Sequence, residues 1–123
     1  MQFATKEHSK LKGYREFILG ADIGGTNSNF GLFGVKNKKI AFLVSFHFKS
    51  NSIKNFRNAL KTLLVCLDEI YGIKISRACI AVAGALSAKK DYAKVTNSNF
   101  HVSKKEIMKC GFKNRNEITK IGF

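Results

Sequence analysis

The sequence lacks the features that would place it in a membrane or outside the cell. Its 123 residues contain no apolar run that approaches the ~18 residues of a membrane-spanning helix. The first residues, MQFATKEHSKLKGYREF, mix charges of both signs and include no apolar core of a secretory signal. The three cysteines (Cys66, Cys79 and Cys110) are odd in number and far apart, which indicates reduced thiols, not a disulfide framework or a zinc site. These absences predict a cytoplasmic protein with no membrane partner.

Acidic residues are also few. There are 8 of them against 22 basic residues, which gives a formal net charge of +14. Such a charge suits a nucleic acid or another polyanion, ATP included. Alternatively, lysine is simply the common surface residue of this protein. Eighteen of the basic residues are lysines scattered along the whole chain, whereas nucleic-acid readers more often cluster arginine with aromatic residues on one face. The second interpretation is favoured, and it argues against a nucleic-acid partner.

The first half of the chain has the pattern of a mixed α/β domain with an antiparallel start. Residues 1–16 are polar and are expected to form an irregular N-terminal extension. Short apolar runs rich in β-formers then predict three strands joined by tight turns. The expected strands cover residues 16–25, 28–35 and 40–48, with a polar turn at 36–39. Three strands joined in this way predict an antiparallel meander.

A change of hydrophobic period then predicts a helix over residues 52–72. Apolar side chains recur every three or four residues, with Ser52 as the expected N-cap and Gly72 as the C-terminal stop. Residues 74–85 follow as a strand, which a right-handed crossover would place parallel to an earlier one. A polar loop with one short strand at 92–96 comes next, and Ser103 with Glu106 forms a capping box for a short helix. The tail after it is weakly patterned.

The stretch ILGADIGGTNSNFGLF, residues 18–33, raises the possibility of a phosphate site. Neither a P-loop nor a dinucleotide-binding GxGxxG motif is present. Gly24 and Gly25 leave the backbone open to an anion, and Thr26 and Asn27 add short donors. An ordinary hairpin turn explains the glycines equally well. Asp22 favours the phosphate interpretation, because a carboxylate beside a triphosphate is a partner for Mg²⁺.

Three segments of the sequence resemble motifs of the glucokinase family, sugar kinases of the actin–hexokinase–heat-shock-protein ATPase superfamily. GADIGGTNSNFGLF resembles its first phosphate motif, CIAVAGAL (79–86) its A-x-A-G-P strand, and AKVTNSNFHVSKKEI (93–107) its T-N segment. The strand at 79–86 departs from the pattern by lacking the proline. The resemblance implies a ribonuclease-H-like domain with a β-β-β-α-β-α start, half of a two-lobe actin-like ATPase fold. Residues 17–123 would form the N-terminal lobe, truncated before the C-terminal domain.

The same resemblance implies an activity: transfer of a phosphoryl group from ATP, with Mg²⁺, to the 6-hydroxyl of glucose or a related hexose. It assigns nucleotide binding to Ala21, Asp22, Ile23, Gly24, Gly25, Thr26 and Asn27, with Asp22 as the magnesium residue. It places Asn97 close to the sugar-binding loop. The family carries its catalytic carboxylate at the end of an apolar strand reading I-N-D-F. The best counterpart, NEITKIGF, puts Asn116 on the sugar and Glu117 in the place of the catalytic Asp, although both also fit an ordinary solvated tail.

Length bears on this expectation. Members of the family are roughly two to three times as long, and their C-terminal lobe completes the cleft. The chain is therefore expected to be inactive alone and to need a second lobe. A fragment, a split-gene product completed by a second polypeptide, and a decayed copy or pseudogene product all fit this expectation. The rival hypothesis is a non-catalytic regulatory or DNA-binding relative of the sugar kinases. The charge of +14 favours this rival, whereas the lack of a helix-turn-helix before residue 17 argues against it.

Overall fold

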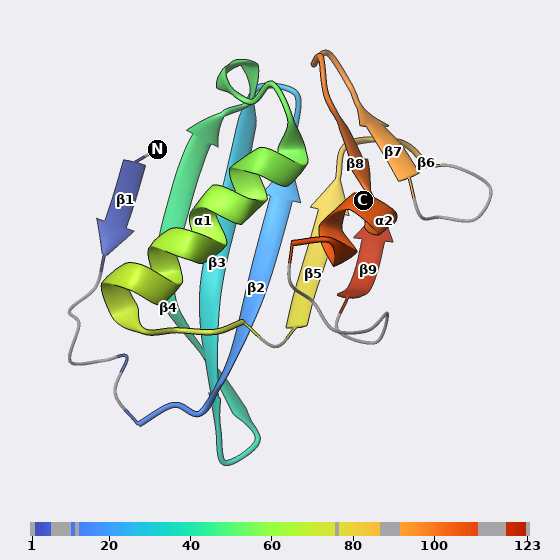
Figure 1. Cartoon of the computed structure of the whole chain (residues 1–123). Helices are drawn as coiled ribbons and strands as arrows, with labels where there is room; N and C mark the ends of the chain where they lie inside the picture. The colour runs from blue at the N-terminus through green and yellow to red at the C-terminus, as the bar shows by residue number, and fades with distance from the viewer. Residues whose placement is uncertain are drawn as a thin grey trace.

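A computed structural model shows two sheets and two helices (Figure 1). It describes residues 2–5, 11, 13–75, 77–86, 92–110 and 118–122. The larger sheet has the strand order β1-β4-β3-β2-β5-β9, and the smaller has the order β6-β7-β8. The strands are β1 (Gln2–Thr5), β2 (Glu16–Ile23), β3 (Asn27–Lys36), β4 (Lys39–Lys49), β5 (Arg77–Val82), β6 (Gly84–Leu86), β7 (Tyr92–Val95), β8 (His101–Ser103) and β9 (Ile118–Gly122). The helices are α1 (Phe56–Tyr71) and α2 (Lys104–Met108), and a 3₁₀ turn covers Ser50–Ser52.

Strands β2, β3 and β4 form the predicted antiparallel meander. The turn between β3 and β4 has positive φ angles at Asn37 (51°) and Lys38 (63°), which matches the right-handed twist of a two-residue hairpin. The register of β3 on β4 shifts between Leu32 and Phe33. Because of this bulge, the consecutive residues Leu43 and Val44 are both buried, while Phe42 points to the opposite side of the sheet.

Helix α1 connects β4 to β5, and β5 lies parallel to β2 as predicted. The helix ends at Gly72, which has a left-handed φ of 67° and confirms the predicted stop. The prediction of Ser52 as N-cap is wrong. The Ser52 hydroxyl donates to the Lys49 carbonyl (2.6 Å), and the side chain of Asn55 instead accepts from the Asn58 amide (3.1 Å). The element order β2-β3-β4-α1-β5 is the one that the residue pattern predicted.

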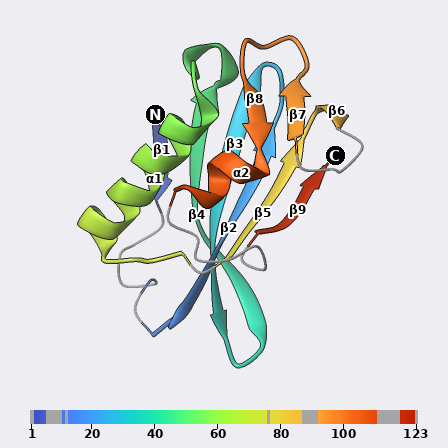
Figure 2. The same cartoon turned by 45° about the vertical axis from the view of Figure 1, so that its right-hand side comes forward.

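The core lies between the larger sheet and the two helices. Both helices are on one side of the sheet, with α1 over β2 to β4 and α2 near β5 and β9 (Figures 1 and 2). The buried face of α1 consists of Phe56, Leu60, Leu63 and Leu67. These side chains belong to one cluster with Leu19, Phe30 and Leu32 of the sheet. Neither of the two helices in the described part of the chain is long and apolar enough to cross a membrane.

Three parts of the fold differ from the sequence-based prediction. Residues 2–5 form β1 on the edge of β4, where an irregular extension was expected. The loop after residue 86 holds two strands, β7 and β8, where one was expected. The weakly patterned tail contains β9, which pairs in parallel with β5. Strands β1 and β9 depend on partners distant in sequence, so the local residue pattern does not reveal them, whereas β7 and β8 form a local hairpin of short strands.

Candidate nucleotide site

The predicted phosphate turn connects β2 to β3 at the carboxyl end of β2. It is closed by a hydrogen bond from the Gly24 amide to the Asn27 carbonyl (2.9 Å). Neither Gly24 nor Gly25 is among the described glycines with positive φ, which are Gly13 and Gly72. The glycines are therefore not required for a left-handed backbone; they lack the Cβ atoms that would crowd neighbouring main-chain atoms.

Ser50 holds the carbonyl side of this turn. Its amide donates to the Thr26 carbonyl (2.9 Å), and its hydroxyl donates to the Gly24 carbonyl (2.5 Å). The hydroxyl of Ser28 lies 2.8 Å from that of Ser50, and both serines are fully buried. Because the single hydroxyl proton of Ser50 goes to Gly24, Ser28 donates to Ser50. Ser50 thus holds the Gly24 and Thr26 carbonyls directly, and Ser28 holds the hydroxyl of Ser50.

The amide side of the turn is left open. Within the residues that the structure describes, neither the Gly25 nor the Thr26 amide has a hydrogen-bond acceptor. Thr26 and Asn27 are exposed, and Gly24 and Gly25 are partly exposed. Successive main-chain N–H groups that face solvent together form a site suited to an anion. The arrangement therefore has the donors that phosphate oxygens need.

Asp22 is exposed beside this turn. In the sheet it pairs with Asn29 of β3 and Ala81 of β5, and no described residue forms an ion pair with it. Asn29 in turn accepts a hydrogen bond through its Oδ1 from the Nδ1–H of His47 (2.6 Å). A lone accessible carboxylate fits Mg²⁺, which keeps several waters and binds one or two carboxylates together with substrate phosphates. The part of the chain that the structure describes holds no group of three or more His, Cys, Asp or Glu side chains that could hold a metal ion.

Asn97 lies in the turn between β7 and β8, close to the phosphate turn. Its φ of 59° is a left-handed conformation that asparagine tolerates. A Cβ on Gly25 would overlap the carbonyl oxygen of Thr96 and approach the Asn97 side chain. The Thr96 amide donates a hydrogen bond to the Ala83 carbonyl (2.9 Å), and the Ala83 amide donates one to the Ile23 carbonyl (2.8 Å). The three segments that carry the family resemblance therefore meet at one end of the sheet.

Asn116 and Glu117 lie outside the described residues, so their assignments stay predictions. The next residue, Ile118, begins β9 and pairs with Ala78, near the start of β5. Gly122 pairs with Ala81, at the end of β5 that lies beside Asp22. The resemblance leads one to expect an apolar strand before the carboxylate, whereas here the described strand follows Glu117.

Ser28 and Ser50 are not among the site residues predicted from the sequence. Ser28 occupies the core-facing register of β3, together with Phe30 and Leu32. A serine among such neighbours must find a buried partner, so the alternation was an available signal for Ser28. No comparable signal marks Ser50, whose role depends on the position of the β4 end relative to the turn.

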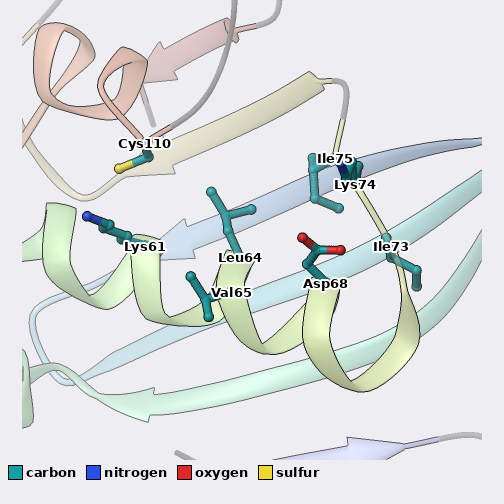
Figure 3. Close-up of a pocket in the computed structure, with 8 residues that line it drawn as sticks. All are labelled: Lys61, Leu64, Val65, Asp68, Ile73, Lys74, Ile75 and Cys110. Carbon is teal, nitrogen blue, oxygen red and sulfur yellow. The ribbon is translucent and has the colours of Figure 1, made fainter.

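A separate hollow of about 290 Å³ lies beside α1 and contains none of the predicted site residues (Figure 3). Lys61, Leu64, Val65 and Asp68 project toward it from α1, and Cys110 lines it near the end of α2. Burial raises the pKa of the Cys110 thiol above its ordinary value. This protonated thiol is a poor nucleophile, so the hollow offers no evident chemistry.

Most of the chain, including this turn, is similar to known proteins. A model of the glucokinase family matches residues 19–115, a range that includes the turn and Asn97 but not Asn116 and Glu117. Comparison with curated proteins gives no match. Among solved structures, a glucokinase from an Antarctic psychrotroph is 28% identical, with a TM-score of 0.69, over 88% of this chain and 32% of that one.

Two protozoan structures share the fold at lower identity. The glucokinase of Balamuthia mandrillaris, solved in complex with glucose, is 21% identical with a TM-score of 0.74, over 98% of this chain and 36% of that one. The glucokinase of Leishmania braziliensis is 14% identical with a TM-score of 0.59, over 94% of this chain and 32% of that one. This chain spans about a third of the length of these structures. The solved structures confirm the predicted α/β class and the glucokinase-type fold of an actin-like ATPase lobe. Because the family model also covers most of the sequence, this chain belongs to the glucokinase family.

Proposed function

We propose that this chain is the N-terminal, phosphate-binding lobe of an ATP-dependent glucokinase and acts in the cytoplasm. The observation that supports the proposal most is the pair of unpartnered amides at Gly25 and Thr26 beside the exposed Asp22. Phosphoryl transfer needs mainly positioning and neutralisation of charge, and this turn has groups for both. Residues 21–27 would bind the phosphates of ATP, with the Gly25 and Thr26 amides donating to phosphate oxygens.

Mg²⁺, when bound, would neutralise phosphate charge next to Asp22. The role of Ser50 and Ser28 in this proposal is to keep the turn carbonyls away from the phosphates, because an exposed carbonyl oxygen would repel an anion. Asn97 would order the loop beside the sugar, Asn116 would contact the sugar, and Glu117 would accept the proton of the 6-hydroxyl. Glucose or a related hexose is the proposed acceptor.

The lobe would need a second polypeptide to complete the cleft. The chain matches only 32% and 36% of the length of two glucokinase structures, so the remaining two thirds of those proteins have no counterpart in it. Half of a cleft makes only part of the contacts to the nucleotide. We therefore expect weak nucleotide binding and no glucose-dependent ATP turnover by this chain alone.

Calorimetric titration with a non-hydrolysable ATP analogue, with and without Mg²⁺, tests the phosphate site. Asp22→Asn removes the charge while keeping the shape, and it should weaken binding at least about tenfold in Mg²⁺, or about 1.4 kcal/mol. Without Mg²⁺ the same change should have no such effect, because the carboxylate acts through the cation. Asp68→Asn on α1 is the matched control. Equal binding by the two variants would reject Asp22 as the magnesium residue.

The rival function, a regulatory or DNA-binding relative, rests on the net charge of +14. It predicts a strongly salt-dependent shift of duplex DNA. A shift that persists at moderate salt, together with no binding of the nucleotide analogue, would favour the rival.

A further inference from the structure

Strand β4 ends beside the phosphate turn, and hydrogen bonds fix its end there. Ser50, directly after β4, holds the Gly24 and Thr26 carbonyls of the turn. Two residues later, the Ser52 hydroxyl donates to the Lys49 carbonyl (2.6 Å). The turn and the end of β4 lie side by side at one end of the larger sheet (Figure 1). Lys49 therefore has a fixed main chain next to the turn.

The last residues of β4 share a face of the sheet with Asp22. In the register of the sheet, Asp22 pairs with Asn29, and Asn29 pairs with His47, so these three residues form one row across β2, β3 and β4. One row nearer to the turn, Asn27 pairs with Lys49. None of these five residues belongs to the buried cluster under the helices. Because paired residues point to the same side of a sheet, all five side chains lie on the side away from α1.

Two hydrogen bonds orient polar groups in these rows. Lys49 Nζ donates to Asn27 Oδ1 (3.4 Å), which leaves two N–H groups of the ammonium for another acceptor. In the neighbouring row, Asn29 Oδ1 accepts the bond from His47 (2.6 Å). The N–H groups of the same Asn29 amide are then left for the other side of the row, where Asp22 lies. The ammonium and this amide are therefore further donors beside the turn.

The end of β4 carries positive charge that no described carboxylate neutralises. Within the residues that the structure describes, neither ion pair includes Lys49 or His47. Asp22, the described acid at this end of the face, is two strands from β4, or roughly 10 Å at the usual strand spacing. A phosphate chain that crosses Asn29 would therefore meet Mg²⁺ at Asp22 on one side and the Lys49 ammonium on the other.

We infer that Lys49 binds the phosphate chain of the nucleotide directly, and that His47 positions the amide of Asn29 for the same chain. This inference rests on the proposed function and extends the phosphate site from the turn to β4. Lys49 acts without a metal, because its ammonium itself donates to phosphate oxygens. Asp22, in contrast, acts through Mg²⁺. Removal of Mg²⁺ therefore separates the two kinds of contact.

Titration with a non-hydrolysable ATP analogue and with inorganic tripolyphosphate, each with and without Mg²⁺, tests the role of Lys49. Amide chemical shifts measured by NMR follow the weak binding expected of a single lobe. Lys49→Gln should weaken the binding of both ligands about tenfold, with or without Mg²⁺, because a charge-assisted hydrogen bond is lost. Lys39→Gln is the matched control, since it removes the same charge from an exposed position at the other end of β4 and should change the affinity little.

His47→Ala and Asn29→Ala test the positioning role. Each should weaken the binding of tripolyphosphate about threefold, because each removes the oriented amide. The double variant should bind about as well as either single variant, since the two changes remove the same contact. A purely structural His47 would lower the Tm of the chain and leave the affinity unchanged. Independent, multiplying losses of affinity in the double variant would show that His47 does not act through Asn29.

The outcomes separate this inference from the proposed function. If the native chain binds and Lys49→Gln binds as well as Lys39→Gln, the inference is overturned while the proposed function stands. A loss in Lys49→Gln that appears only with Mg²⁺ would also overturn it, because a direct contact needs no metal. No binding of either ligand by the native chain would reject the proposed function and the inference with it.

Discussion

Gly25 lies directly against the main-chain carbonyl of Thr96, so closely that a Cβ on Gly25 would overlap the Thr96 oxygen. The contact joins the phosphate turn to the turn that carries Asn97. A chain of hydrogen bonds, Thr96 to Ala83 and Ala83 to Ile23, joins the same two turns through the end of β5. The second glycine of the DIGGTN motif therefore has a packing role in addition to any role toward a ligand.

Gly25→Ala should destabilise the lobe by about 2 kcal/mol, because main-chain atoms on both sides must move to admit a methyl group. Chemical denaturation measures the change. Gly24→Ala is the matched control, since a Cβ there lies 3.2 Å from the Asn27 carbonyl oxygen and requires a smaller adjustment. A larger loss in Gly24→Ala than in Gly25→Ala would contradict the contact with Thr96.

The buried pair Ser28 and Ser50 allows a double-mutant cycle. Ser50→Ala leaves the Gly24 carbonyl and the Ser28 hydroxyl without their partner, and the expected cost is about 1–3 kcal/mol. Ser28→Ala alone should cost less, because Ser50 still donates to Gly24. The double variant should lose less unfolding free energy than the sum of the two single variants, because it leaves no serine hydroxyl unpaired. Additive unfolding free energies would show that the two hydroxyls do not interact.

The ion pair between Arg57 of α1 and Glu106 of α2 should make stability depend on pH. The hydrogen bond from Arg57 (3.0 Å) lowers the pKa of Glu106 in the folded chain below its ordinary value of about 4.3. A lowered folded-state pKa stabilises the fold above the unfolded value, and this contribution is lost as the pH falls through the folded value. Thermal melts of the native chain and Glu106→Gln should therefore differ most near neutral pH.

Towards acid pH the two melting curves should converge, because a protonated Glu106 resembles glutamine. Both groups of the pair are more than 40% exposed, so the difference at neutral pH should be small. Glu69→Gln, on the exposed part of α1, controls for the loss of one acid. A difference between native chain and Glu106→Gln that grew on acidification would show that the ion pair does not cause it.

Local patterns were sufficient to predict the central strands and the long helix of the lobe. The apolar run of β2 and the apolar face of α1 are each properties of a contiguous segment. Phe17, Leu19 and Ile23 are buried, but the run is typical of a strand buried on both faces, and the alternate residues of β2 are not buried. On α1 the predicted face is buried except towards its end, where Ile70 is exposed. The predicted cap at Ser103 is confirmed, because the Ser103 side chain accepts a hydrogen bond from the Glu106 amide (3.4 Å). The reciprocal half of the capping box was not found, because the Glu106 carboxylate pairs with Arg57 instead.

Features that depend on distant segments could not be read from the sequence in this way. The β1 strand exists because the edge of β4 accepts it, and the Ser50 contact exists because the end of β4 passes under the phosphate turn. The N-cap of α1 is Asn55 and not the predicted Ser52, because the Ser52 hydroxyl donates to the Lys49 carbonyl in the 3₁₀ turn at Ser50–Ser52. Each case involves a polar group with several possible partners, and tertiary structure selects among them.

The most direct test of the proposed function is reconstitution with a complementary lobe. The part of the Antarctic glucokinase that this chain does not match is expected to supply the missing lobe, so a mixture of the two should show glucose-dependent ATP turnover that neither shows alone. Glu117→Gln should then lower kcat at least about a hundredfold, since a general base contributes on the order of 10²–10⁴. Glu69→Gln should not. An unchanged rate in Glu117→Gln would exclude this residue as the base.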